Sequence, residues 1–175
     1  MRENNLKNII RILNNDGIGV MPTDTLYGLV GSAFSRKAIN RIYKIKKRNR
    51  SKKLIVLISS ISDLKKFNVN VSKDQAKILA KFWPGKVSVI LNDIAFRIPK
   101  NKKLIEILKK TGPLVVPSAN VEGKKPAETI IQAKKYFGDK VVFYVSGGIL
   151  KSKPSALISI NKKGEIKVLR GTIKK

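Results

Sequence analysis

The chain has 175 residues, which is long enough for one domain that buries about 70% of the surface its unfolded form exposes. It carries 38 Lys and Arg against 11 Asp and Glu, a formal charge of +27 at pH 7, and a protein this basic favours partners that carry phosphate. Because the chain has no cysteine and no histidine, disulfides, thiolate or imidazole metal sites and serine–histidine catalysis are excluded.

The first half of the chain is predicted to alternate between helices and short strands. Apolar residues at helical spacing indicate a first helix: Leu6, Ile9, Ile10 and Leu13. Residues 18–21 are typical of a short buried strand, and Ser35 can cap a second helix that runs into a basic stretch at residues 44–53. Residues 54–58 form a continuous apolar run, as expected of a strand covered on both faces.

The second half continues this alternation. Ser72 and Gln75 have the spacing of a capping box for a third helix, and Asn101 can cap a fourth. A fifth helix is expected at about residues 127–137. The predicted strands are residues 87–91, 94–98, 114–116, 141–145, 156–160 and 166–169. Five helices and about eight strands indicate an α/β or α+β fold with one mixed sheet, and no repeat or linker divides residues 1–175 into more than a single domain.

The sequence carries no sign of a membrane segment or an export signal. No apolar run approaches the length of a membrane span, and the N-terminal segment reads as an amphipathic helix and not as a signal peptide. We therefore expect a cytoplasmic protein that does not contact a membrane.

Polar and charged side chains gather in three segments that are expected to be loops, residues 22–31, 46–53 and 117–127, each of which adjoins an apolar strand. Sites in open α/β sheets lie at strand ends, so we expect the three segments to converge on one site. For residues 22–31 the alternative is an ordinary strand-to-helix connection, in which proline and glycine only mark the turn.

Without histidine and cysteine, the chemistry that the sequence favours is electrostatic. Lys46, Arg48 and Lys52 can clamp phosphates, and phosphoryl or nucleotidyl transfer depends mainly on such positioning and charge neutralisation. The alternative for these residues is a solvated basic helix end. Ser118 and Asn120 can present a hydroxyl and an amide to a ribose, a phosphate or an amino acid, or they can form a turn by bonding to local backbone.

Short motifs occur in a fixed order along the chain. The main ones are Pro22-Thr23-Asp24-Thr25-Leu26-Tyr27-Gly28-Leu29, Lys46-Lys47-Arg48 and Ser118-Ala119-Asn120, and the weaker ones are Phe82-Trp83-Pro84-Gly85, Arg97-Ile98-Pro99, Pro154-Ser155 and Leu169-Arg170-Gly171. This ordered set, which spans about residues 8–173, resembles the YrdC family, the short threonylcarbamoyl-adenylate synthases also called TsaC.

The resemblance implies a single domain with a twisted, mixed, open sheet and a deep, positively charged cavity. It implies an enzyme, a nucleotidyltransferase that condenses L-threonine, bicarbonate and ATP to threonylcarbamoyl-AMP, with Mg²⁺ accompanying the pyrophosphate that leaves. The partner implied is a threonylcarbamoyl transferase complex, which moves the threonylcarbamoyl group to an adenosine beside the tRNA anticodon. Direct contact with tRNA is compatible with this activity.

By position, the resemblance also assigns roles to residues of this chain. Thr23 is expected to contact threonine, and Lys46, Arg48 and Lys52 to hold the ATP phosphates, with Lys46 and Arg48 catalytic. The other expected substrate- or nucleotide-binding residues are Arg97, Ser118, Asn120, Ser155 and Arg170. No metal ligand is implied, and Asp24 is expected to cap or brace its turn and not to act as a base.

The chain departs from the family pattern at several positions. Asn49 and Lys53 stand where the family usually has proline, so the loop that contains them is expected to be looser when no substrate is bound. The other departures are Leu57 in place of a histidine, Glu122 in place of a serine, and Ala156 in place of a threonine. A weaker threonine site or a slower reaction would follow from these changes.

The second hypothesis for function is a non-catalytic RNA-binding module, suggested by the charge of +27. Aromatic residues make up only 6% of the chain and few lie among the basic runs, which disfavours base stacking as a mode of binding. A general lysine bias, which places lysine on solvated surfaces without any ligand, is another explanation of the charge.

Overall fold

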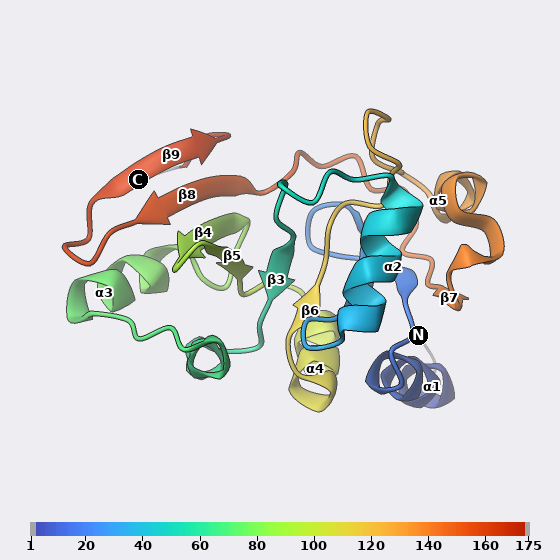
Figure 1. Ribbon diagram of the computed structural model, residues 1–175, viewed down its shortest axis with the longest axis horizontal. Coiled ribbons are helices and arrows are strands. Elements are labelled where there is room, and N and C mark those ends of the chain that lie inside the picture. Colours follow the sequence, from blue (N-terminus) through green and yellow to red (C-terminus); the bar gives the residue numbers. More distant parts are fainter. Residues whose placement is uncertain (1–2, 174–175) are drawn as a thin grey trace.

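The computed structural model describes residues 3–173, and in this range the predicted alternation is present as one mixed sheet with helices on both faces (Figure 1). The helices are α1 Glu3–Asn14, α2 Arg36–Lys46, α3 Lys73–Phe82, α4 Lys102–Thr111 and α5 Ile130–Phe137. The strands are β1 Gly19–Pro22, β2 Tyr27–Ser32, β3 Ile55–Leu57, β4 Val87–Leu91, β5 Ile94–Arg97, β6 Leu114–Val115, β7 Phe143–Tyr144, β8 Ala156–Ile160 and β9 Ile166–Arg170. Two short 3-10 helices are η1 Ile61–Phe67 and η2 Gly138–Lys140.

The sheet combines hairpins with parallel crossovers in the order β7-β1-β2-β6-β3-β5-β4-β8-β9. The pairs β1–β2, β2–β6, β3–β6, β4–β5 and β8–β9 are antiparallel, whereas β1–β7, β3–β5 and β4–β8 are parallel. The prediction of a mixed, open sheet is therefore confirmed.

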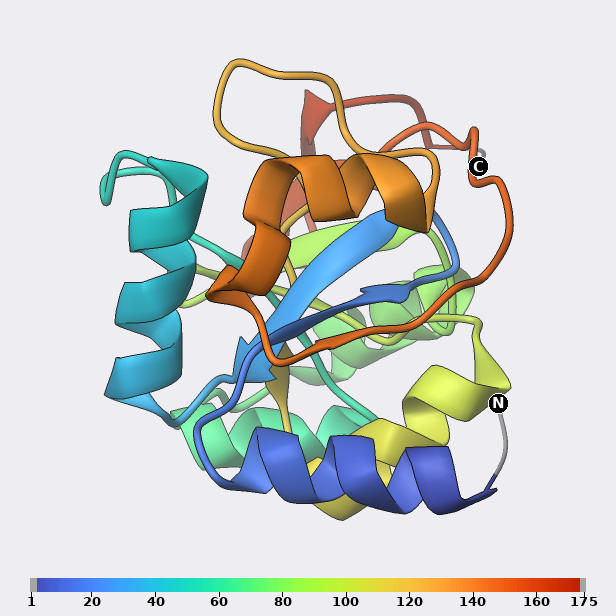
Figure 2. The same ribbon diagram turned by 90° about the vertical axis from the view of Figure 1, so that its right-hand side faces the viewer.

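Each face of the sheet has its own core, because successive strand residues point to opposite sides. Val20 and Leu29 belong to the core that includes side chains of α2 and α5, whereas Met21 and Val30 belong to the core that includes side chains of α1 and α4. Figure 2 shows α1 and α4 side by side along one side of the sheet and α2 and α5 along the other.

The predicted helix caps are present. The Ser35 hydroxyl accepts a hydrogen bond from Ala38 N at 3.0 Å, and the Asn101 side chain accepts one from Leu104 N at 3.0 Å. Ser72 and Gln75 form the expected capping box at the start of α3. Local polar side chains thus fix where these helices begin, as the sequence predicts.

Residues 22–31 are not a loop, which corrects the sequence-based expectation. They form a tight turn followed by β2, which pairs with β1 from Gly19–Val30 to Pro22–Tyr27. Glycine weakens an ordinary strand, but here it permits close packing. A Cβ at Gly28 would overlap the Val116 side chain, and one at Gly31 would lie 3.1 Å from the Ile42 side chain.

Two further elements differ from the prediction. α5 begins at Ile130 and not near residue 127, because Ala127 N is bonded to Ala119 O at 3.0 Å and the Thr129 hydroxyl caps the helix at Gln132 N. The short helix η1 has no counterpart in the prediction. It is held by Asp63, whose carboxylate accepts bonds from the backbone and the hydroxyl of Ser59.

Of the helices in the described part of the chain, none has the length and apolar character needed to cross a membrane.

Candidate active site

The turn between β1 and β2 is held by the Thr23 hydroxyl. This hydroxyl donates to Leu26 O at 2.7 Å and accepts from Thr25 N at 3.1 Å and Leu26 N at 3.2 Å. Thr25 Oγ1 lies 3.1 Å from Thr23 Oγ1. Because the single hydroxyl proton of Thr23 is already used within the turn, any further bond to a ligand can only be one that Thr23 accepts.

Asp24 braces the turn against β5. Its Oδ1 lies 2.8 Å from Arg97 NH1, and its Oδ2 accepts a bond from Lys100 N at 3.0 Å. The two side chains are only 7% and 5% exposed. Burial lowers the pKa of Arg97 from its usual value, and the charge of Asp24 opposes this effect. The expectation that Asp24 is a brace is confirmed.

Arg97 also carries an unused donor at the wall of a cavity. Its Nε is buried and has no hydrogen-bond partner among the residues that the structure describes. Buried polar groups are nearly always satisfied, so this unpaired N–H marks Arg97 as a residue whose hydrogen bonding is incomplete without a ligand.

β2 connects the turn to the segment that contains Ser118. Leu29 N donates to Pro117 O at 2.9 Å and Ala119 N donates to Tyr27 O at 2.8 Å, which places Ser118 opposite Gly28. The Ser118 hydroxyl in turn donates to Asn120 Oδ1 at 2.7 Å, and Asn120 Nδ2 donates to Val121 O at 3.0 Å and to Lys124 O at 2.8 Å. Asn120 therefore bonds to local backbone, as the alternative for this segment expects, whereas Ser118 lies in the cavity wall.

Lys46 is a buried support and not a solvated helix end. It is 1% exposed, and its Nζ donates to Ser118 O at 2.5 Å and Asn120 O at 2.6 Å. Burial lowers the pKa of Lys46 to about 8, and repulsion from Arg48 adds to this effect. Lys46 therefore fixes the backbone of residues 118–120 from behind.

The free energy of unfolding is expected to rise with pH between about 8 and 10.5 because of Lys46. In that window the folded protein has lost the Lys46 proton, whereas the unfolded chain, with the ordinary lysine pKa of 10.5, still holds it. The desolvation cost is fully present below pH 8 and is relieved above it, by no more than about 1.4 kcal/mol per pH unit. Urea unfolding of wild type and Lys46→Met across this range tests the point, because the free energy of unfolding of the wild type minus that of the variant should rise with pH. Parallel stability curves would contradict the lowered pKa.

Arg48 and Arg170 bring two positive charges to the same space. Arg48 Nε donates to Lys52 O at 3.0 Å, and Arg48 NH2 donates to Lys53 O at 3.3 Å. Arg170 NH2 donates to Ser155 O at 3.1 Å. Burial lowers the pKa of Arg170, and the nearby charge of Arg48 lowers it further. Backbone carbonyls hold both guanidinium groups in place. Because both groups are positively charged, an anion between them would relieve their repulsion.

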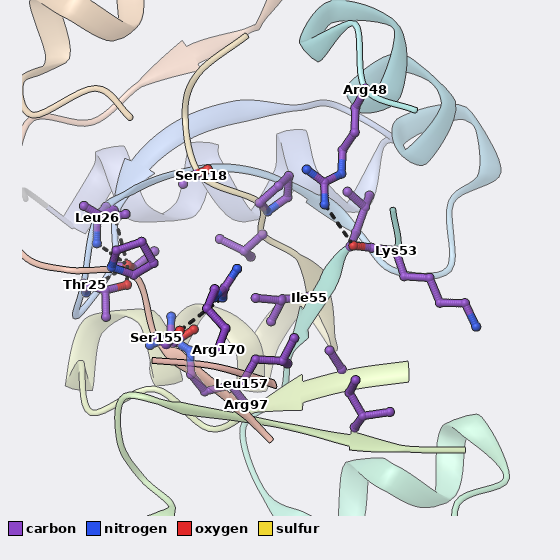
Figure 3. A pocket seen from close by; sticks show the side chains of 18 of the residues that line it. Thr25, Leu26, Arg48, Lys53, Ile55, Arg97, Ser118, Ser155, Leu157 and Arg170 are labelled. Atoms are coloured by element: carbon purple, nitrogen blue, oxygen red, sulfur yellow. Dashed lines mark hydrogen bonds between the residues drawn. The ribbon is translucent and has the colours of Figure 1, made fainter. Parts of the chain in front are cut away.

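These residues surround a cavity of about 400 Å³, a size typical of ligand sites (Figure 3). In Figure 3, Arg48 lies on one side of the cavity and Arg97 and Arg170 on the other. Its cationic lining residues are Arg48, Lys53, Arg97 and Arg170, against the single carboxylate of Asp93. Residues from all three polar segments line it, which confirms that they converge.

The structure separates the predicted site residues into two groups. Those that line the cavity are Thr23, Arg48, Arg97, Ser118, Ser155 and Arg170. Lys46, Lys52 and Asn120 do not line it, which corrects the expectation that the three predicted phosphate-binding cations, Lys46, Arg48 and Lys52, face one site. Lys46 and Asn120 lie behind the wall, and Lys52 Nζ is paired with Glu122 at 2.6 Å.

Several lining residues are not among those predicted. Thr25 lies in the same motif and the same turn as Thr23, and this position is the signal in the sequence that points to it. Lys53 stands where the family usually has proline, and its place in the basic stretch is the signal that points to it. Ile55 and Leu157 give the cavity an apolar side, and nothing in the sequence distinguishes them from other strand residues.

Comparison with known proteins assigns the chain to a family. The Sua5/YciO/YrdC model, described as "Telomere recombination", matches residues 11–172, and the chain belongs to this family. A threonylcarbamoyl-AMP synthase from Marinobacter nauticus is 30% identical over 162 residues, which span 82% of this chain and 85% of that relative. The match to the Mycobacterium tuberculosis relatives spans 66% of their length.

Solved structures share the fold. E. coli YciO has a TM-score of 0.86 at 20% identity, with 97% of this chain and 89% of YciO covered. P. abyssi Sua5, solved in complex with L-threonine, has a TM-score of 0.83 at 23% identity, with 97% of this chain and 54% of Sua5 covered. The mixed sheet with helices on both faces is therefore the architecture of these proteins.

Proposed function

We propose that this protein condenses L-threonine, bicarbonate or CO₂, and ATP to threonylcarbamoyl-AMP and pyrophosphate. The observation that carries the proposal is one cavity lined by three arginines, Arg48, Arg97 and Arg170. A buried guanidinium with an unused Nε, that of Arg97, lies in its wall, and the unneutralised pair Arg48 and Arg170 faces the same space. Membership of a family whose relatives are named threonylcarbamoyl-AMP synthase supports the proposal.

Arg97 is proposed to bind the carboxylate of threonine. Its NH1 is fixed by Asp24, so the guanidinium is held in one orientation before a ligand arrives. Thr25 and Thr23, which also line the cavity, are proposed to contact the threonine side chain or amine. The L-threonine complex of the P. abyssi relative is consistent with an amino-acid site in this fold.

Arg48 and Arg170 are proposed to hold the phosphates of ATP, with Lys53 nearby and with Ser118 and Ser155 lining the nucleotide or product site. Charge that develops on the phosphate oxygens during transfer is stabilised by such fixed cations. Lys46 and Asn120 would then act indirectly, because they hold the backbone at Ser118. Lys52 can reach a phosphate only if it leaves Glu122.

The proposed reaction has two bond-forming steps. The amine of threonine loses a proton to bicarbonate or water and forms an N–C bond with CO₂, or with bicarbonate with loss of hydroxide, to give a carbamate. A carbamate oxygen then attacks the α-phosphorus of ATP, and the bond to the β-phosphate breaks as its electron pair leaves with pyrophosphate. The protein contributes orientation and charge neutralisation to both steps.

Mg²⁺ is proposed to enter as a complex with ATP. Within residues 3–173 no group of three or more His, Cys, Asp or Glu side chains is placed to hold a metal ion. A Mg²⁺ ion that is already bound to phosphates needs few ligands from the protein, so it can be delivered together with ATP. The product would pass to a threonylcarbamoyl transferase that acts on tRNA, and we propose that this takes place in the cytoplasm.

A substrate-omission assay tests the proposed function. Pyrophosphate release should require ATP, L-threonine and bicarbonate together, and omission of any one should reduce it to background. Pyrophosphate release that is independent of threonine would refute the proposed substrate, and no release with all three present would refute the reaction.

A second candidate function, RNA binding, rests on a groove beside α2. It is lined by Asn40, Arg41, Tyr43, Lys44, Lys47, Arg48 and Arg50, without a carboxylate. Arg50 lies over the Tyr43 ring at 5.4 Å, which gives the groove one aromatic–cation platform. Such a surface suits a phosphodiester backbone, and tRNA is the partner that agrees with the proposed reaction.

The binding constant for single-stranded RNA or tRNA should therefore fall steeply with salt. The triple variant Lys44→Gln, Lys47→Gln, Arg50→Gln is expected to reduce the log–log salt slope by about 2, at roughly 0.7 per phosphate. The control is Lys162→Gln, Lys163→Gln, Lys167→Gln on the distant β8–β9 hairpin. Equal slopes in both triple variants would show that the positive charge acts without a defined site.

A further inference from the structure

We propose that Glu122 is a positioning residue of the ATP site. Glu122 holds the basic loop, residues 47–53, against the segment 117–127, and the loop in turn holds Arg48 in the cavity wall. The kinetic part of this inference rests on the proposed function, whereas the contact itself does not.

Glu122 reaches the basic loop at several points. Its Oε2 accepts a bond from Asn49 N at 2.9 Å, and its Oε1 lies 2.6 Å from Lys52 Nζ. Its own backbone N donates to Lys46 O at 2.8 Å, at the end of α2. The three contacts lie at the last residue of α2, at the backbone of Asn49 and at the side chain of Lys52, so one residue joins both α2 and the loop to the segment 117–127.

The basic loop needs such an anchor because its own residues repel one another. Its cations are Lys47, Arg48, Arg50, Lys52 and Lys53, and neither Asn49 nor Lys53 restricts the backbone as proline would. The bond from Lys52 and then that from Asn49 N lower the pKa of Glu122, so the side chain is charged at neutral pH. A carboxylate that accepts a backbone N–H makes a charge-assisted bond, stronger than a neutral one.

The position of Arg48 depends on the part of the loop that Glu122 holds. Arg48 Nε is bonded to Lys52 O at 3.0 Å, and Arg48 NH2 to Lys53 O at 3.3 Å. Glu122 and Arg48 thus both contact Lys52, Glu122 at its Nζ and Arg48 at its backbone O. If the carboxylate is removed, Lys52 O keeps its bond from the Tyr43 hydroxyl at 3.2 Å, but the loop loses its anchors at Asn49 N and Lys52 Nζ, so we expect Arg48 to be held less firmly.

Glu122 is not placed to do chemistry itself. It does not line the cavity, and its side chain is 25% exposed, beside a Lys52 side chain that is 61% exposed. An exposed ion pair of this kind contributes little to global stability. The expected consequence is therefore local, in the order of the basic loop and the affinity for ATP.

Two variants separate the contacts of Glu122. Glu122→Ala removes all side-chain contacts, whereas Glu122→Gln keeps an acceptor for Asn49 N but loses the ion pair. Glu106→Ala, which removes an exposed ion pair with Lys110 on α4, is the matched control. The measurements are amide exchange of residues 47–53 without substrate, the Kd for ATP by calorimetry, and the KM for ATP and threonine.

Glu122→Ala is expected to accelerate exchange at the Asn49 amide about tenfold and to raise the Kd and KM for ATP about 5- to 10-fold, as the loss of one charge-assisted bond implies. The KM for threonine should change less than about twofold, because a local effect does not reach Arg97. Glu122→Gln should fall between Glu122→Ala and wild type, and Glu106→Ala should behave as wild type.

Three results would overturn the inference. They are unchanged amide exchange in Glu122→Ala, faster exchange with an unchanged Kd for ATP, and tighter ATP binding, which would mean that the carboxylate competes with phosphate for Lys52. If the wild type makes no adenylate, the proposed function fails, but exchange and ATP binding still decide whether Glu122 acts as inferred.

Discussion

Replacement of Arg48 by alanine is expected to lower kcat/KM for pyrophosphate formation about 100-fold, the usual effect of removing one well-placed charge from a transition state. Arg48 stands in the cavity wall with its guanidinium held by two backbone carbonyls, and within residues 3–173 no carboxylate lies within hydrogen-bonding distance of it. Its charge is thus available to the phosphates. The measurement is steady-state pyrophosphate release, with circular dichroism to show that the variant remains folded.

Two further variants sharpen the Arg48 result. Arg48→Lys keeps the charge but loses the planar fork of donors, so an intermediate activity is expected. Arg50→Ala removes an equally basic neighbour that lies over Tyr43 and lines the groove beside α2 but not the cavity, and its activity should remain within about twofold of wild type. Full activity in Arg48→Ala would show that Arg48 does not hold the phosphates of ATP.

Replacement of Asp24 by alanine is expected to destabilise the fold by about 3–5 kcal/mol, because it leaves the Arg97 charge buried without its partner. The pair is 2.8 Å apart with side chains 5% and 7% exposed, and Asp24 also accepts from Lys100 N. Activity should fall as well, since Arg97 loses the contact that orients it. Urea unfolding of the wild type and the variant measures the change in free energy.

A double variant tests the physical reason. Asp24→Ala, Arg97→Met should recover part of the lost stability, because no unpaired charge is then buried. Asp74→Ala, which breaks an exposed pair with Lys77 at 3.7 Å, is the control and should cost less than about 1 kcal/mol. A cost for Asp24→Ala no larger than that of the control would show that the turn is held by other contacts.

Much of the fold could be predicted because its signals are local. Ser35, Ser72 and Asn101 precede apolar patterns of helical period, and each caps the helix that it predicts. The strand β3 follows from a continuous apolar run, and β4–β5 from two runs that flank Asn92-Asp93. Convergence of the three polar segments followed from the rule that sites lie at strand ends, and the cavity confirms it.

The remaining features depend on contacts between distant residues. Gly28 and Gly31 suggest a flexible loop, but they are required by close packing against Val116 and Ile42, which sequence cannot place. Lys46 looks like a solvated cation at a helix end, yet backbone carbonyls more than 70 residues away receive its ammonium group. Glu122 looks like a substitution that weakens the site, and only the fold shows that it bonds to the basic loop.

The most direct test of the account is the identity of the product. Wild-type protein incubated with ATP, L-threonine and ¹³C-labelled bicarbonate should form one nucleotide whose mass corresponds to threonylcarbamoyl-AMP, with the label in the carbamoyl carbon and one pyrophosphate released per molecule. Formation of ADP and phosphate, or of AMP without an attached labelled carbon, would contradict the proposed reaction.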